Sequence, residues 1–185
     1  MYPTEIEVNG ITYKINTDYR VALACFKAIE DDSINDTERA LAIITLLLGK
    51  DVRYKDYEEC LNKCAIYLRC GKEENDDINE ADMDYLQDEE IIRTSIRQCY
   101  HENINEKYLH WWEYNELIEG LTEETALSQI RELRSYDLSD ETDEKRKKQI
   151  QKAKNRVALK KHNVKKEFTE EEIKNMEEFR RLTNS

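Results

Sequence analysis

The chain has 185 residues, a formal net charge of −12, and nearly equal shares of hydrophobic (39%) and charged (38%) residues. This length suits one domain with an extension or two small domains, since domains usually contain about 100 to 200 residues. An acidic surface repels duplex DNA and acidic membranes, which excludes both as partners of the average surface. The apolar runs are much shorter than the ~20 residues of a membrane-spanning helix, and the first residues do not resemble a signal peptide, so we expect no membrane contact.

The charge is unevenly distributed along the sequence. Residues 71–90 contain ten acidic residues and one lysine, a local net charge of −9. Residues 144–166 contain eleven Lys or Arg residues and one acidic residue, a local net charge of +10. Opposite charges on one molecule favour pairing within the chain or between copies, so we expect self-association.

The five cysteines lack the spacing of a disulfide framework; they are Cys25, Cys60, Cys64, Cys70 and Cys99. An odd number of unpatterned cysteines is typical of a reducing compartment, where they pack as small apolar residues. A zinc site could be drawn from Cys60, Cys64 and Cys70 together with Cys99 and His101. Structural zinc sites prefer close cysteine pairs on loops, whereas Cys60 and Cys64 fall at core positions of a predicted helix. We therefore expect no metal and no other cofactor.

The first predicted element is a β-hairpin over residues 5–15. Apolar and polar residues alternate on both sides of Asn9-Gly10, a pair that fits a two-residue type I′ turn. A single hairpin is only marginally stable in water, so we expect it to pack on the helices that follow.

Three helices are predicted next. Thr17 is placed to cap the first, which runs to about residue 30. Asn35 and Glu38 resemble the capping box of a second helix over residues 36–48, which is apolar nearly all round. The third is expected over roughly residues 55–70, and the acidic stretch after it is expected to be a loop.

Three further helices complete the predicted body. Apolar spacing predicts one over residues 82–102 and another over the stretch EKYLHWWEYNELIEGL at 106–121. Thr122 is placed to cap the last, whose buried side includes Leu127. The expected class is therefore mainly α (α+β), with an N-terminal hairpin packed on a compact multi-helix body in residues 1–139.

Residues 140–185 are expected to form an extension of two helices. The first is lysine-rich and carries a short apolar stripe of Ile150, Ala153 and Val157. The second is an amphipathic terminal helix capped by Thr169, with a narrow apolar face that favours a partner.

The adjacent tryptophans are the strongest candidates for partner binding. Trp111 and Trp112 lie about 100° apart on a helix, so one narrow core stripe cannot hold both centrally. Tryptophan is enriched among the energetically important residues of interfaces, although a pair of core and rim aromatics remains the alternative. The expected partner surface combines these residues with nearby tyrosines and the terminal helix: Tyr108, Trp111, Trp112, Tyr114, Ile173, Met176 and Phe179.

His110 is the residue best placed for acid–base catalysis, since imidazole titrates near neutral pH. It shares a largely apolar helix face with Tyr114 and Leu117, which favours a hydrogen-bonded core histidine. The sequence contains none of the phosphate-binding, dinucleotide-binding, zinc-protease or nucleophile-elbow motifs. We expect no catalytic residues and no enzyme; an enzyme of unmarked type centred on His110 is one alternative.

The basic run over residues 145–161 provides a second alternative, a nucleic-acid-binding accessory protein. It could follow a phosphate backbone, but it lacks interleaved aromatic residues, and the acidic remainder of the chain would oppose a polyanion. A solvated or acid-paired helix is the favoured interpretation, so nucleic acid is not the expected partner.

Three segments together resemble a known family. They are VNGITYKINTDYR at 8–20, LHWWEYNELIEGL at 109–121, and IRELRSYDLS at 130–139 followed by a lysine-rich helix ending in NRVAL. The sequence resembles the bacteriophage gene product 15 family of long-tailed phages and prophages of Gram-positive bacteria, over roughly residues 5–159.

The resemblance implies a tail assembly chaperone. Such a protein would bind the tape-measure protein, keep it soluble and help to recruit tail-tube subunits before it leaves the assembly. The implied partners are the tape-measure and tail-tube proteins, and the implied location is the cytoplasm of the bacterial host, with the protein absent from the mature virion. The family motif implies no catalytic residues.

Overall fold

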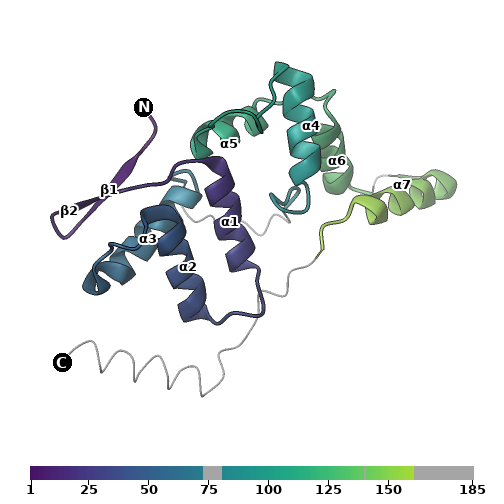
Figure 1. The fold of residues 1–185 in the computed structure, drawn as a ribbon. Helices are drawn as coiled ribbons and strands as arrows, with labels where there is room; N and C mark the ends of the chain where they lie inside the picture. Colours follow the sequence, from purple (N-terminus) through teal and green to yellow (C-terminus); the bar gives the residue numbers. More distant parts are fainter. Residues whose placement is uncertain (73–80, 140, 161–185) are drawn as a thin grey trace, which may run out of the picture.

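The structure, a computed structural model, describes residues 1–72, 81–139 and 141–160. A two-stranded antiparallel hairpin comes first, β1 (Glu5–Val8) and β2 (Ile11–Lys14). The α-helices of the described residues are α1 (Tyr19–Ile29), α2 (Asp36–Leu48), α3 (Tyr57–Leu68), α4 (Glu89–Tyr100), α5 (Trp111–Glu119), α6 (Ala126–Ser135) and α7 (Glu144–Val157). A short 3-10 helix, Tyr54–Asp56, leads into α3. Figure 1 shows the hairpin next to α3, whereas α7 lies at the opposite end of the molecule. The order of the elements confirms the predicted mainly α class with an N-terminal hairpin.

The hairpin has the predicted register and turn. Val8 pairs with Ile11, and both turn residues have positive φ, 49° at Asn9 and 71° at Gly10. These values suit a type I′ turn, which glycine and asparagine adopt most readily. The inner face of the hairpin buries Val8 and Tyr13 against α2 and α3, so the hairpin is stabilised by packing as expected.

The capping box of α2 is confirmed. The Asn35 side chain accepts a hydrogen bond from the backbone N–H of Glu38, and the Glu38 carboxylate accepts one from the Asn35 N–H.

Two other predicted caps are wrong. Asp18, not Thr17, caps α1, because the Thr17 backbone pairs with the segment before α5. Thr125, not Thr122, caps α6 and accepts from Ser128 N.

Two predicted helices begin later than expected. Residues before α4 form a turn in which the Asp84 carboxylate accepts hydrogen bonds from the N–H groups of Leu86 and Gln87, which competes with helical bonding. The stretch before α5 is not helical either, and His110 has an extended backbone with φ −65° and ψ 140°. Apolar spacing alone reveals neither the Asp84 turn before α4 nor the extended backbone before α5.

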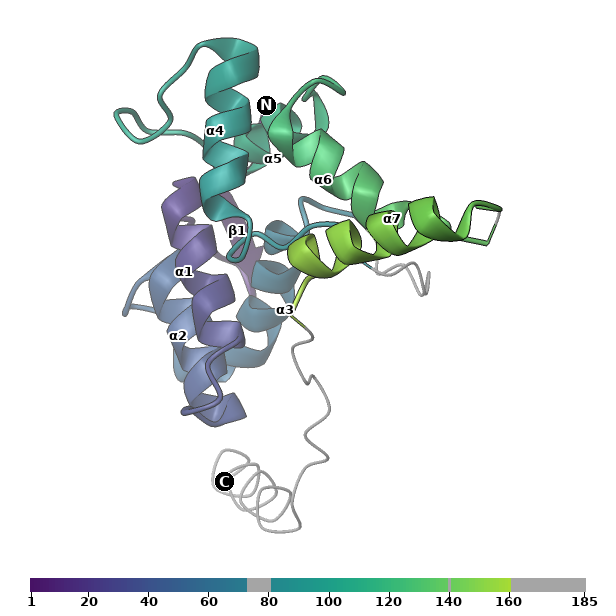
Figure 2. The ribbon, with the colours of Figure 1, turned by 90° about the vertical axis from the view of Figure 1, so that its right-hand side faces the viewer.

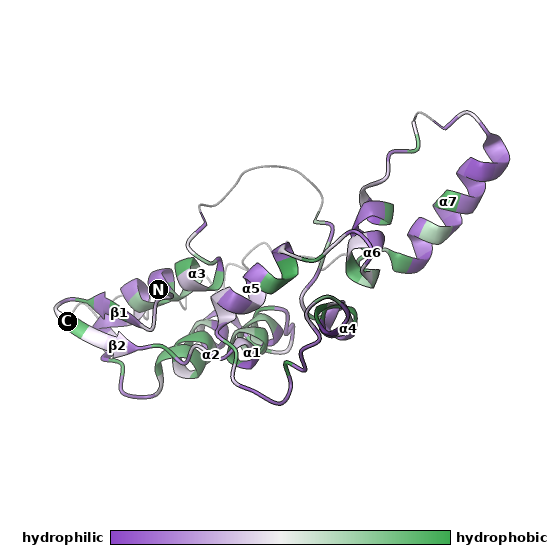
Figure 3. Ribbon diagram, turned by 90° about the horizontal axis from the view of Figure 1, so that it is seen from above, coloured by the Kyte–Doolittle hydropathy of each residue, from purple (hydrophilic) through white to green (hydrophobic). Residues whose placement is uncertain are grey.

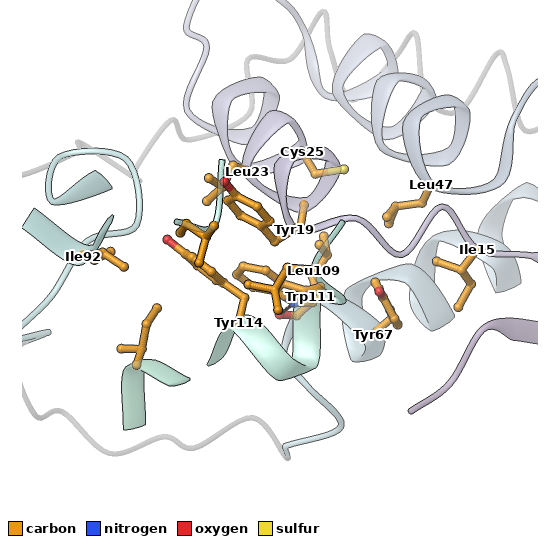
Figure 4. Close-up of a cluster of buried hydrophobic side chains, with 14 of the residues drawn as sticks. Ile15, Tyr19, Leu23, Cys25, Leu47, Tyr67, Ile92, Leu109, Trp111 and Tyr114 are labelled. Atoms are coloured by element: carbon orange, nitrogen blue, oxygen red, sulfur yellow. Dashed lines mark hydrogen bonds between the residues drawn. The ribbon is translucent and has the colours of Figure 1, made fainter. Parts of the chain in front are cut away.

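The main core lies between α1 and α5 and extends to α2, α3, α4 and α6. Trp111 and Tyr114 from α5 face Tyr19 of α1, with the Tyr19 and Tyr114 rings stacked at 4.6 Å (Figure 4). Burial of such large aromatic side chains is a main source of stability. None of the described helices combines the length and apolar character that crossing a bilayer requires.

Helix α7 packs on α6 and projects beyond the rest of the body (Figure 2). Its ribbon is mostly coloured as hydrophilic in Figure 3, with short hydrophobic segments, and none of its residues is buried. The stripe of Ile150, Ala153 and Val157 is half-buried. The boundary predicted at residue 140 falls between α6 and α7; the division into a body of residues 1–139 and an extension of residues 140–185 stays a prediction.

Candidate functional site

The segment just before α5 joins distant parts of the chain. Leu109 accepts a backbone hydrogen bond from Tyr19 (3.0 Å), and Trp111 donates one to the carbonyl of Thr17 (2.8 Å). Asp18 and His110 form an isolated antiparallel bridge between these two bonds. The residues before Trp111 are therefore held as an extended strand beside the start of α1, which explains why α5 begins at Trp111.

His110 is buried and both of its ring nitrogens are engaged. Nδ1 accepts a hydrogen bond from the backbone N–H of Trp112 (3.0 Å), and this caps α5. Nε2 lies 3.0 Å from the carbonyl oxygen of Pro3, to which it donates in the tautomer that leaves Nδ1 as acceptor. The ring also stacks on Tyr2. The predicted hydrogen-bonded core histidine is confirmed, at a helix cap instead of a helix face.

The two tryptophans both bind the end of α3. Trp111 Nε1 donates to the carbonyl of Leu68, and Trp112 Nε1 donates to the carbonyl of Tyr67, each across 3.0 Å. The last carbonyls of a helix have no N–H donor within the helix, so they need other donors when they are buried. The Tyr67 carbonyl also accepts from the backbone N–H of Cys70 (3.0 Å). The tryptophan pair therefore caps α3 from a neighbouring helix.

The predicted partner-binding residues differ in how far they are exposed to solvent. Trp111 is 0% exposed and Tyr114 is 1% exposed, so both are core residues and offer no surface to a partner in this fold. Tyr108 is 59% exposed and Trp112 is half-buried, and partner binding by these two stays a prediction. The remaining three, Ile173, Met176 and Phe179, lie outside the described residues.

A groove of about 340 Å³ opens beside Trp112. It lies between β1, the outer face of α3 and the start of α5, and it is lined by Pro3, Glu5, Ile6, Glu7, Ile15, Lys63, Ile66, Tyr67, Gly71 and Trp112. Ile66 is 49% exposed and adds an apolar side chain to the wall of the groove. An open, largely apolar groove with a tryptophan wall is a candidate site for another molecule.

Helix α7 presents the second candidate surface. The exposed basic residues within residues 145–160 are Lys145, Arg146, Lys148, Lys152, Arg156 and Lys160. The end of α7 is fixed to the body, since Arg134 of α6 donates from Nε to the carbonyl of Val157 (2.6 Å). Gln87 also donates to the carbonyl of Ala158 and accepts from Lys160 N. The basic face is thus held in a defined position.

Arg134 is itself positioned by a buried ion pair. Its two terminal nitrogens donate to the two carboxylate oxygens of Asp88 at 2.6 and 2.8 Å, and the side chains are only 8% and 1% exposed. A bidentate pair in this environment fixes both side chains. Asp88 lies next to the first residue of α4, so this pair connects α4, α6 and α7.

Two of the buried cysteines are held in their protonated form. Burial raises the pKa of the Cys25 and Cys64 thiols to about 12, so both are protonated at neutral pH. In the described parts of the chain, no three His, Cys, Asp or Glu side chains are grouped closely enough to hold a metal ion.

Asp56 is a buried carboxylate that the sequence pattern did not single out. It accepts hydrogen bonds from Asn9 (2.9 Å), Tyr13 (2.8 Å) and Arg53 (2.6 Å). Burial opposes its ionisation, but these three hydrogen bonds outweigh burial and lower the Asp56 pKa to about 2. Asp56 therefore ties the hairpin to the start of α3.

The fold and the two surfaces define a small, mainly α-helical protein with an N-terminal hairpin, an open apolar groove and a docked basic helix. A sequence model described as Bacteriophage Gp15 protein matches residues 2–159, so the chain belongs to this bacteriophage family. The match confirms the resemblance carried by the three segments quoted above. No curated protein and no solved structure shows a significant match.

Proposed function

We propose that the protein is a non-catalytic tail assembly protein, and specifically a tail assembly chaperone that binds the tape-measure protein and helps to recruit tail-tube subunits. Membership of a bacteriophage family over residues 2–159 is the observation that carries this proposal. Family membership points to a structural or assembly role, and the chaperone role comes from the resemblance. In this role the protein acts in the host cytoplasm and leaves before the virion is mature.

Two structural features support an interaction protein over an enzyme. The groove beside Trp112 is open and largely apolar, the character expected of a surface that grips another chain. His110 uses both ring nitrogens to hold Trp112 and Pro3, which leaves neither free to move a proton. The earlier alternative of an enzyme centred on His110 therefore has little support.

The test is co-expression with the product of the gene immediately downstream, which the family resemblance implies is the tape-measure protein, followed by size-exclusion chromatography with light scattering. The expected result is that the large downstream product stays soluble only in a stable complex with this protein. A downstream product that is soluble alone and does not bind would overturn the chaperone role. Light scattering on the protein alone also tests the proposed self-association.

The nucleic-acid alternative rests on the exposed basic residues of α7. Binding of this kind weakens steeply as salt rises, because each phosphate contact releases counterions. A salt titration with single-stranded and duplex nucleic acid separates it from the chaperone proposal. The acidic net charge of −12 works against this alternative.

A further inference from the structure

The register of the hairpin determines where the backbone of β1 points. Ile15 N donates to the carbonyl of Thr4 (2.8 Å), and the pairing continues through Ile6 with Tyr13. In an antiparallel pair, hydrogen-bonded and non-hydrogen-bonded positions alternate. The N–H and C=O groups of Glu5 and Glu7 therefore point away from β2, toward the outer edge of β1.

That outer edge borders the groove. β1, not β2, lies on the α3 side of the hairpin (Figure 3), and Glu5 and Glu7 line the groove together with Ile66 and Tyr67 of α3. Within the described residues the sheet has only two strands, so no third strand occupies this edge. An exposed strand edge with free hydrogen-bonding groups is a template for pairing with another chain.

The groove also has side-chain preferences. Its floor is apolar, formed by Ile6 and Ile15 from the hairpin side and by Tyr67 and Trp112 from the helices. The Trp112 ring is held against Gly71, where an added Cβ atom would lie 3.1 Å from the ring. One face of an added strand would contact these apolar side chains, because side chains alternate between the two faces of a strand.

The other face of an added strand would lie beside carboxylates. The Glu5 and Glu7 side chains share the outer face of β1, and both residues are exposed. Opposite charges at neighbouring positions on adjacent strands stabilise a sheet. Lys63, the one basic residue among the described residues of the groove, comes from α3 instead of the sheet. The outer positions of an added strand therefore favour Lys or Arg.

We propose that the groove binds an extended segment of a partner protein as a third strand on β1, with basic residues on its outer face alternating with apolar residues directed at Trp112 and Ile66. β1 has four residues, so the bound segment is of similar length. The inference concerns the chemistry of the segment and does not depend on the chaperone proposal.

The probe is a synthetic eight-residue peptide of alternating lysine and valine, added to the full chain. Two controls have the same length: a scrambled peptide of the same composition without alternation, and a peptide of alternating glutamate and valine. Binding is followed by tryptophan fluorescence, since Trp112 forms a wall of the groove while Trp111 is fully buried. The expected result is saturable binding of the alternating lysine peptide and at least about tenfold weaker binding of both controls.

Matched variants locate the binding to the edge of β1. Glu7→Pro removes an N–H that points toward the groove, whereas Thr12→Pro removes the equivalent outward N–H on β2, since Glu7 and Thr12 are paired. We expect Glu7→Pro to weaken binding of the alternating lysine peptide by about tenfold and Thr12→Pro to leave this binding unchanged. Ile66→Ser should also weaken binding, whereas Leu41→Ser, at a similarly exposed residue (46%) on α2, should not.

Amide hydrogen exchange provides a direct readout of strand addition. The N–H groups of Glu5 and Glu7 should exchange rapidly in the free protein and become protected when the lysine peptide binds. The proposal is overturned by equal binding of the scrambled or acidic peptide, by an absence of saturable binding, or by protection at Thr12 in place of Glu5 and Glu7. Circular dichroism confirms that each variant is folded before it is compared.

Discussion

Trp111 donates its indole N–H to the carbonyl oxygen of Leu68, the last residue of α3, across 3.0 Å. The neighbouring indole of Trp112 does the same to Tyr67. The adjacent indoles thus bind adjacent carbonyls at the end of α3, of which the Tyr67 carbonyl also accepts a hydrogen bond from the backbone N–H of Cys70 (3.0 Å). Partner binding is not required to account for the pair, although Trp112 keeps one side open to the groove.

Trp111→Phe should destabilise the protein by about 1–3 kcal/mol or somewhat more, because it leaves the buried carbonyl of Leu68 without a donor and removes part of a core side chain. Urea unfolding gives the free energy of unfolding. Trp112→Phe is the matched control, since its indole N–H binds the preceding carbonyl but its ring is half-buried. A smaller loss of unfolding free energy for Trp111→Phe than for Trp112→Phe would contradict this explanation.

Arg134→Met should cost about 3–5 kcal/mol, because it leaves the Asp88 carboxylate buried without its cation. It also removes the hydrogen bond to the carbonyl of Val157, so α7 should become more susceptible to proteolysis than the rest of the body. Arg131→Met is the control: in its ion pair with Asp82 the two side chains are 37% and 36% exposed, so the pair is solvent-screened and is worth about 0–1 kcal/mol. Equal losses of unfolding free energy for Arg134→Met and Arg131→Met would show that the buried Arg134–Asp88 pair contributes no more to stability than the Arg131–Asp82 pair.

Asp56 should make the protein sensitive to acid. Its pKa is about 2 in the folded protein against an ordinary value of 3.8, so the folded state binds its proton less tightly than the unfolded chain. The stabilisation is complete above about pH 3.8 and is lost as the pH falls toward about 2. The free energy of unfolding, measured across this range, should fall less steeply for Asp56→Asn than for the wild type. Asp51→Asn, at an exposed residue, should retain the wild-type slope.

Gly71→Ala should destabilise the protein by more than Gly10→Ala. Both glycines have similar positive φ values, 73° and 71°, which cost an L-residue about 1–2 kcal/mol. Only at Gly71 would the new Cβ atom approach the Trp112 ring, whereas nothing lies within 4 Å at Gly10. Thermal unfolding measures the difference in stability, and a change in Trp112 fluorescence should accompany only Gly71→Ala. Indistinguishable variants would show that the ring moves aside freely.

The elements fixed by local chemistry were the most predictable from the sequence. Asn9-Gly10 specifies its turn through backbone conformation, and Asn35 with Glu38 specifies a helix start through hydrogen bonds three residues apart. Both depend on neighbours in the chain, so a pattern reveals them. The strongly periodic helices were also found, with errors at their ends.

The candidate site was less predictable because its contacts span the chain. His110 binds Pro3, and Trp111 binds Thr17 and Leu68, partners that no local spacing identifies. The groove was missed for the same reason: Ile66 stands on α3 like any other helical residue until β1 is placed beside it. Asp56 resembled one more surface acid in an acidic chain, and only the fold shows its three donors.

The contact between Pro3 and His110, which are separated by 107 positions, has a consequence for synthesis on the ribosome. The hairpin and the first three helices are synthesised well before residues 108–112. The hydrogen bonds from this segment to the end of α3 and to Pro3 therefore form only later. During that interval the edge of β1 lies beside an incomplete groove without its Trp112 wall. The order in which the chain appears thus leaves the groove without its Trp112 wall until α5 has been made.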